Sequence, residues 1–256
     1  MTGGQKKGRK KFWRLKKKEE GRPQDKILSK DTPFYTKEAY KALRTNLIFS
    51  LPDAGSKVII ITSASPGEGK STNSLNLAIT FAEMGAKVCL VDCDLRMPKL
   101  AGLMSQKGAP GLSNTLVHLN SLEEVLRHTK YENLDCIYAG EIPPNPAELL
   151  VSEKMDEILT SLRERYDYIF LDTPPVNTVT DVSLLAGKAN GTVLVVRQGV
   201  TVKEDLSEAV HQLAFVKAKV LGFILNDTVQ NGSKGYRYDK GRYAMEESST
   251  GKKTEG

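Results

Sequence analysis

Apolar residues in this chain gather into short continuous runs, and most runs are followed by a stretch with helical spacing. β-branched side chains are frequent in the runs, which is typical of strands buried on both faces of a parallel sheet. Strands are predicted at residues 58–61, 87–91, 134–138, 168–171, 191–196 and 220–225. Helices are predicted at 38–49, from the segment after residue 69 to Met84, and at 146–165, 181–189 and 203–217. This alternation predicts an α/β fold with a central, mostly parallel sheet and helices on both faces.

The predicted helix at 38–49 has helical spacing, with Ala39, Ala42, Leu43 and Leu47 on one side. Since apolar side chains on one stripe of a helix are normally buried, we expect this face to pack on the domain.

Length and charge divide the chain into three parts. Its 256 residues suit one α/β domain with tails. Residues 1–22 carry ten Lys and Arg against two Glu, a net charge of +8, whereas the whole chain has +6, so the remainder sums to −2. We therefore expect a basic, disordered segment at 1–30, a P-loop domain at 31–228, and a flexible, tyrosine-containing tail at 229–256.

The cysteines and the apolar runs indicate the compartment. Cys89, Cys93 and Cys136 are too few and too irregularly spaced for a disulfide framework, so we expect buried, reduced thiols. No apolar run approaches the roughly 18–20 residues that span a bilayer, and the N-terminus lacks the apolar core of a signal peptide. These features favour a cytoplasmic protein.

The most informative motif is SASPGEGKST at residues 63–72, directly after the first predicted core strand. It fits the phosphate-binding P-loop of a P-loop NTPase, with Ala64 in place of the first glycine. Small residues let consecutive N–H groups turn toward an anion, and the following helix adds the positive end of its dipole. We expect Lys70 to reach the β- and γ-phosphates of ATP and the Ser71 hydroxyl to bind Mg²⁺. The triphosphate-binding residues are predicted to be Pro66, Gly67, Glu68, Gly69, Lys70 and Ser71.

Polar side chains follow three further strands. Asp172 ends the run YIFLD and is the expected Mg²⁺ ligand, through water. Asp92 and Asp94 lie in VCLVDCDLR; one suits a general base and the other a metal ligand, or both only position water. Arg96 is expected either to contact phosphate or to pair with Asp94. Asn226 closes the last strand, where it reads the edge of an adenine ring or serves as a turn residue.

Three tyrosines, Tyr236, Tyr238 and Tyr243, lie in a polar tail that offers no core to bury them. Three interpretations stand: stacking on nucleic acid with the neighbouring arginines, acceptance of phosphate, or simple tolerance in a disordered tail.

From about Glu38 to Tyr243 the chain resembles the bacterial tyrosine kinases (BY-kinases) of capsule and exopolysaccharide assembly. The motifs that carry the resemblance are SASPGEGKST, VCLVDCDLRMP, AGEIPPNPAELL, YIFLDTPP and the tail tyrosines. The wider relatives are partition and cell-division-site ATPases of the MinD and ParA type. Their P-loop generally carries an additional early Lys where this chain has Ser65, which counts against a dimerising ATPase of that type.

The resemblance implies an ATP-dependent protein-tyrosine kinase and assigns roles to its residues. Lys70, Ser71 and Thr72 serve the phosphate and Mg²⁺ site, with Asp172 as a metal ligand. Asp92 becomes the base toward the tyrosine hydroxyl, and Asp94 its metal-binding neighbour.

The resemblance also implies that the tail tyrosines Tyr236, Tyr238 and Tyr243 are autophosphorylated between subunits of a homo-oligomeric ring such as an octamer. The ring-forming motif ExxRxxR matches Glu38, Lys41 and Arg44, with Lys in place of the central Arg. Because Lys cannot form the bidentate contact of a guanidinium, ring stability is an open point.

Because no membrane-spanning half precedes the kinase-like part, the chain resembles the split arrangement with a separate transmembrane activator of the polysaccharide co-polymerase type. Cytosolic protein substrates and a protein-tyrosine phosphatase are the other implied partners. The nine basic residues between Lys6 and Lys18 suit an anionic inner leaflet, at about 1 kcal/mol each. A solvated tail and nonspecific nucleic-acid binding are the alternatives for this block, the latter not favoured. The competing function is a nucleotide-driven positioning switch that binds membrane or DNA.

Overall fold

The computed structural model describes residues 23–52 and 54–228. In this part of the chain seven strands form one sheet, in the order β3-β4-β2-β5-β1-β6-β7. Their bounds are β1 Lys57–Ser63, β2 Val88–Asp92, β3 Leu126–His128, β4 Leu134–Ile137, β5 Tyr168–Asp172, β6 Gly191–Arg197 and β7 Val220–Asn226. All neighbouring strands pair in parallel except β3 and β4. The predicted α/β fold with a mostly parallel sheet is confirmed.

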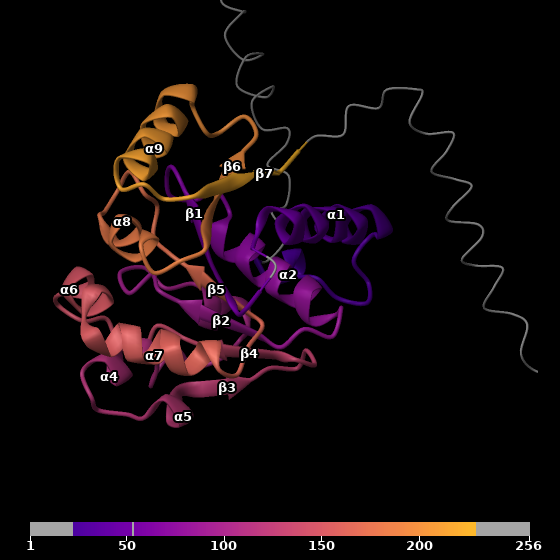
Figure 1. The fold of residues 1–256 in the computed structure, drawn as a ribbon. Coiled ribbons are helices and arrows are strands. Elements are labelled where there is room, and N and C mark those ends of the chain that lie inside the picture. The colour runs from indigo at the N-terminus through magenta and orange to yellow at the C-terminus, as the bar shows by residue number, and fades with distance from the viewer. Residues whose placement is uncertain (1–22, 53, 229–256) are drawn as a thin grey trace, which may run out of the picture. The chain divides into compact units, whose positions relative to one another are not determined.

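Helices cover both faces of this sheet (Figure 1). A short 3₁₀ helix at Pro23–Lys26 precedes α1. The α-helices are α1 Phe34–Ser50, α2 Lys70–Ala82, α3 Leu100–Leu103, α4 Leu112–Leu116, α5 Leu122–Val125, α6 Pro146–Val151, α7 Glu153–Arg163, α8 Asp181–Ala186 and α9 Lys203–Phe215. Helices α1 and α2 pack on one face, and α6 to α9 pack on the other.

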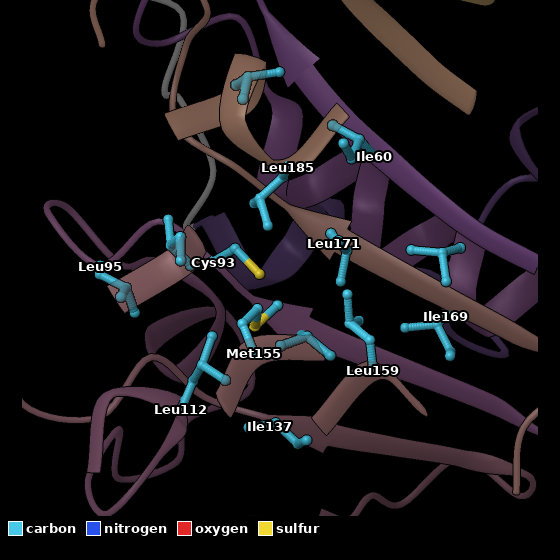
Figure 2. Packing of buried hydrophobic residues seen from close by; sticks show 14 of the residues in the cluster. Ile60, Cys93, Leu95, Leu112, Ile137, Met155, Leu159, Ile169, Leu171 and Leu185 are labelled. Carbon is cyan, nitrogen blue, oxygen red and sulfur yellow. The ribbon is translucent and has the colours of Figure 1, made fainter. Parts of the chain in front are cut away.

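Alternate side chains of each central strand feed two separate cores. In β5, Ile169 and Leu171 join the cluster that includes Leu159 of α7, which Figure 2 shows from close by. Phe170 points to the opposite face and packs against Phe81 of α2, with ring centroids 5.2 Å apart. Strands buried on both faces are therefore continuously apolar, which is why the sequence showed runs rather than alternation.

The single helix predicted at 146–165 is wrong, because the chain breaks at Ser152. Ser152 has ψ 155°, an extended conformation, and its hydroxyl accepts a hydrogen bond from Met155 N as the N-cap of α7. A serine side chain competes with backbone bonding inside a helix and favours a cap, so one apolar pattern became α6 and α7. The three-residue antiparallel strand β3 was not predicted, since LRH is too short and polar to stand out.

The face predicted to be buried on the first helix is only partly right. In α1, Leu47 is buried and Leu43 is half-buried against the core, but Ala39 and Ala42 are exposed. Tyr40 packs on the core instead. The contact stripe is thus rotated toward the larger side chains, which bury more apolar area than alanine.

Two expectations about composition can be compared with the structure. Cys89, Cys93 and Cys136 are buried and free, as predicted. Within the described ranges, no helix is both long enough and apolar enough to cross a membrane.

The sheet order brings the predicted chemistry to one edge. Strands β2, β5 and β1 are neighbours, and Asp172 at the end of β5 is paired in register with Ile61 of β1 and with Asp92 of β2. Because all three strands run parallel, the loops that follow them meet beyond the same edge.

Candidate active site

The P-loop joins β1 to α2 and wraps the start of that helix. Gly67 and Gly69 have φ values of +82° and +93°, the left-handed region that other residues rarely adopt. Gly69 is the N-cap of the 13-residue helix α2, and Lys70 is its first residue. The first N–H groups of this helix have no intrahelical partner, so the loop and helix end together can bind an anion.

Lys70 lies between two carboxylates at this helix end. Its Nζ is 2.8 Å from Asp94 Oδ2 and 3.8 Å from Asp172 Oδ2, and 3.4 Å from the Ser71 hydroxyl. All four side chains are buried. Burial lowers the pKa of Lys70, but Asp172 and Asp94 raise it more, so the ammonium stays charged.

Asp172 has one carboxylate oxygen bound and one without a hydrogen bond. Its Oδ1 accepts a hydrogen bond from the Ser74 hydroxyl at 3.1 Å. Among the described residues its buried Oδ2 accepts none, although the residue is fully buried. Burial raises the pKa of Asp172, and the Lys70 ammonium opposes that rise.

These residues fit a magnesium ion bound to a phosphate. Asp172 Oδ2 has the Lys70 ammonium 3.8 Å away but accepts no hydrogen bond, so a Mg²⁺ ion or its water would satisfy it, because an unsatisfied buried polar atom is costly. Ser71, Asp94 and Asp172 supply the hydroxyl and carboxylate oxygens that Mg²⁺ prefers. The fit to Mg²⁺ therefore rests on Asp172 Oδ2, which accepts no hydrogen bond, and on the oxygen ligands that the three side chains offer.

Asp92 is tied to the loop that follows β2. Its Oδ1 accepts a hydrogen bond from Asp94 N at 3.2 Å, and its Oδ2 accepts one from Leu100 N at 3.2 Å. Burial, followed by the Asp172 carboxylate, raises the pKa of Asp92 to about 8. Asp92 thus shapes the loop that presents Asp94, and its assignment as the base stays a prediction.

The loop between β6 and α9 holds the P-loop from the side. Glu68 is 1% exposed, and its carboxylate accepts hydrogen bonds from Ser65 N at 3.2 Å and from the Thr201 hydroxyl. Arg197 donates to the Gly67 carbonyl at 3.2 Å. Glu68, predicted as a phosphate-loop residue, therefore acts through its side chain on the shape of the loop. Sequence reasoning missed Thr201, because nothing in the local pattern around it indicates a partner 133 residues away.

Asn226, predicted to lie at the nucleotide site, contacts the P-loop. Its Nδ2 donates to the Glu68 carbonyl at 2.9 Å. A Cβ built on Gly69 would lie 2.3 Å from the same Nδ2. The amide therefore packs on the bare Gly69 backbone, and the expected reading of an adenine edge stays a prediction.

Arg96 pairs with a residue that the sequence did not single out. Its Nε and Nη2 lie 3.0 and 3.1 Å from the two carboxylate oxygens of Asp181. Asp181 is fully buried at the start of α8, so this bidentate pair joins α8 to the loop after β2. The expected pairing with Asp94 is wrong, because the Asp94 oxygens are bound by Lys70 and by Met97 N. A phosphate contact by the part-exposed guanidinium stays a prediction.

Comparison with known proteins decides the family. A family model described as an AAA domain matches residues 56–228. The tyrosine-protein kinase YwqD of Bacillus subtilis is 39% identical over 225 residues, covering 88% of this chain and 95% of that protein. The chain belongs to the bacterial tyrosine-protein kinases.

Other members agree with this placement. The putative tyrosine-protein kinase CapB of Staphylococcus aureus is 35% identical over 201 residues, covering 78% of this chain and 88% of CapB. The crystal structure of the chimerical protein CapA2B2 matches with a TM-score of 0.73 at 35% identity, over 75% of this chain and 85% of that one. The kinase domain of Escherichia coli ETK matches with a TM-score of 0.73 at 32% identity, over 77% of each chain.

The positioning ATPases are more distant. MinD of Pyrococcus horikoshii, solved with Mg-ADP, matches with a TM-score of 0.58 at 25% identity, over 72% of this chain and 76% of that one. The shared P-loop fold is consistent with nucleotide and Mg²⁺ use. The comparisons favour the tyrosine kinases over the MinD-like alternative, in agreement with Ser65 at the place of the early P-loop Lys.

The predicted ring-forming motif lies on α1. Lys41 Nζ is 2.7 Å from Glu38 Oε1, and both side chains are about half exposed. Arg44 instead donates to the Thr80 carbonyl of α2 at 2.6 Å. Within the described residues, Arg44 therefore fastens α1 to the nucleotide-binding helix, and Glu38 and Lys41 are accessible.

Of the remaining predicted site residues, two lie in the described part of the chain and the tail tyrosines do not. Thr72 lies in the first turn of α2 and Pro66 at the exposed tip of the P-loop. The predicted phosphoacceptors Tyr236, Tyr238 and Tyr243 lie outside the described residues, as does the basic N-terminal block.

Proposed function

We propose that this chain is an ATP-dependent protein-tyrosine kinase that phosphorylates its own C-terminal tyrosines in trans and regulates capsule or exopolysaccharide synthesis. The observation that carries the proposal is the buried cluster of Lys70, Asp94 and Asp172 at the end of the P-loop. Membership in the tyrosine-kinase family supports transfer to tyrosine rather than to water alone.

The chain's own residues supply positioning and charge, which is most of what phosphoryl transfer asks of a protein. The first N–H groups of α2 and the Lys70 ammonium would bind the β- and γ-phosphates of ATP. Ser71, Asp94 and Asp172 would hold Mg²⁺, which neutralises charge on the phosphate oxygens when it is bound. Because these groups are buried, their electrostatic effect on the phosphates is larger than it would be in water.

Asp92 is our candidate for the base toward the tyrosine hydroxyl. Its carboxylate stands beside Asp172 across the β2–β5 pairing, close to the phosphate site. The alternative is that Asp92 only orders the loop carrying Asp94.

The proposed acceptors are Tyr236, Tyr238 and Tyr243 of a neighbouring copy in a homo-oligomeric ring, with Glu38 and Lys41 at the contact and Arg44 holding their helix on α2. A separate transmembrane activator of the polysaccharide co-polymerase type would hold the kinase at the inner face of the membrane. Cytosolic enzymes of polysaccharide synthesis would be further substrates, and a protein-tyrosine phosphatase would reverse the modification. Longer relatives support a two-part system, since the match covers 32% of the length of E. coli Etk, and CapA2B2 is itself a chimera.

The test is phosphotyrosine formation by the full chain with ATP and Mg²⁺, with and without the cytoplasmic segment of the activator. We expect a strong signal with the activator segment, mapped by mass spectrometry to the tail. Lys70→Met is expected to abolish the signal, and replacement of all three tail tyrosines by Phe to abolish tail modification without loss of nucleotide binding. Hydrolysis of ATP stimulated by lipid or DNA, with no phosphotyrosine, would favour the positioning ATPase instead.

A further inference from the structure

A row of hydrogen-bonded side chains runs between α1 and α2 and ends on the P-loop. The Tyr40 hydroxyl of α1 donates to Asn73 Oδ1 at 2.9 Å, and Asn73 Nδ2 donates to the Gly69 carbonyl at 2.9 Å. Asn76 Nδ2 donates to the same Tyr40 hydroxyl at 3.0 Å. Asn73 and Asn76 are 2% and 1% exposed, so water cannot readily replace these partners.

The last acceptor in the row controls a peptide group that faces the phosphate site. The Gly69 carbonyl and the Lys70 N–H belong to one planar trans peptide, so they point in opposite directions. When Asn73 holds the carbonyl toward the helix, the Lys70 N–H is aimed outward from the helix start, where an anion binds. The Asn73 backbone N–H also donates to the Gly69 carbonyl, at 3.0 Å, so the Asn73 side chain supplies the second of two bonds that set the direction of this peptide.

The other end of the row is anchored on the N-terminal arm, residues 23–31. Asn76 Oδ1 accepts a hydrogen bond from Leu28 N at 2.8 Å, and its Nδ2 also donates to the Lys26 carbonyl at 3.0 Å. The side chain of Leu28 is buried on the α2 side of the sheet. The Tyr40 hydroxyl of α1 is therefore bonded to two side-chain amides of α2. One is Asn76, which is anchored on the N-terminal arm, and the other is Asn73, which bonds the P-loop.

We propose that Tyr40 is a positioning residue for the nucleotide: its hydroxyl fixes the Asn73 amide, which orients the Gly69–Lys70 peptide toward the phosphates. The inference rests on the proposed function in one respect, that this P-loop binds the nucleotide. The phenol acts as donor to Asn73 and acceptor from Asn76 at the same time, which phenylalanine cannot do. Without the hydroxyl, Asn73 Oδ1 has lost its donor and the amide is free to turn away from Gly69.

The experiment compares Tyr40→Phe with Tyr166→Phe in the full chain. Tyr166 is a matched control, because its hydroxyl also donates a hydrogen bond to a side chain, to Asp135 Oδ2 at 2.6 Å. It lies between α7 and β5, before the strand begins, so this bond is at the edge of the sheet opposite the P-loop. Affinity for the fluorescent nucleotide mant-ADP is titrated with Mg²⁺ present, and the thermal midpoint is measured for each variant.

Tyr40→Phe is expected to weaken mant-ADP binding about threefold to tenfold, the effect of one hydrogen bond. Tyr166→Phe is expected to bind mant-ADP as the wild type does, even where its thermal midpoint falls as far as that of Tyr40→Phe. Asn73→Ala should weaken binding at least as much as Tyr40→Phe. The double variant should be no weaker than Asn73→Ala alone, because both changes break the same row.

Two results overturn the inference. One is unchanged affinity in Tyr40→Phe while the wild type binds mant-ADP. The other is a double variant whose loss equals the product of the two single losses, since independent effects multiply. A wild-type chain that binds no nucleotide overturns the proposed function together with this inference, so the two failures are distinguishable. If Tyr40→Phe does not fold, Asn73→Ala carries the test, and wild-type affinity in that variant overturns the inference.

Discussion

Gly69→Ala tests whether the P-loop is shaped by contact with β7. A Cβ at Gly69 would lie 2.3 Å from Asn226 Nδ2 and 3.3 Å from Asn226 Cγ. The amide can escape only by rotating away, and it then loses its 2.9 Å bond to the Glu68 carbonyl. The substitution therefore combines two costs: a non-glycine residue at φ +93° and one broken hydrogen bond.

Gly67 separates these costs, because it lies in the same loop with φ +82° and has nothing within 4 Å of an added Cβ. Left-handed strain costs about 1–2 kcal/mol, so this is the expected loss of unfolding free energy in Gly67→Ala. A lost hydrogen bond adds about 1 kcal/mol, which gives about 2–3 kcal/mol for Gly69→Ala. Asn226→Ala by itself should cost about 1 kcal/mol.

The assay is urea unfolding of the four variants, including the double variant of Gly69→Ala and Asn226→Ala. Since Gly69→Ala already breaks the Asn226 bond, the double variant should be no less stable than Gly69→Ala alone, a coupling of about 1 kcal/mol. Additive losses, or equal losses in Gly67→Ala and Gly69→Ala, would refute the reasoning. Unchanged m-values are the check that the folded and unfolded states are comparable.

Three other outcomes can be measured on the same protein. Thr201→Val removes a donor from the buried Glu68 carboxylate and should lower the free energy of unfolding in urea by about 1–3 kcal/mol. Thr201→Ser keeps the hydroxyl and should recover most of that stability. Equal losses in the two variants would argue against the Thr201–Glu68 hydrogen bond. Ser152→Ala removes the N-cap of α7 and should cost about 1 kcal/mol, with phosphotyrosine formation unchanged; a stability equal to the wild type would contradict the cap. Chelation by EDTA should abolish phosphotyrosine formation and added Mg²⁺ should restore it, and activity that survives chelation would exclude the proposed metal role of Asp172.

The place of the site could be predicted because its residues follow strands. Asp92 and Asp172 end apolar runs, Asp94 comes two residues after Asp92, and Lys70 follows the loop after β1; a parallel sheet brings the ends of such runs to one edge. The same logic gave the fold, since buried parallel strands leave continuous apolar runs in the sequence. The apolar pattern did not predict the helix break at Ser152, which depends on one capping side chain. It also did not predict β3, a short strand that forms by pairing with β4 at the edge of the sheet.

The sequence by itself therefore determined the sheet, the P-loop and the acidic residues around it, because each depends on a local pattern. Only the tertiary structure decided which side chains form hydrogen bonds and ion pairs with one another. Asn226 meets Glu68 across 158 residues, and Arg96 meets Asp181 across 85. No periodicity encodes such pairs, because a hydrogen bond depends on distance and direction, and these are set only when separate elements pack together. The bonds of Tyr40 to α2 belong to the same class, and they connect a residue of α1 to the P-loop through Asn73.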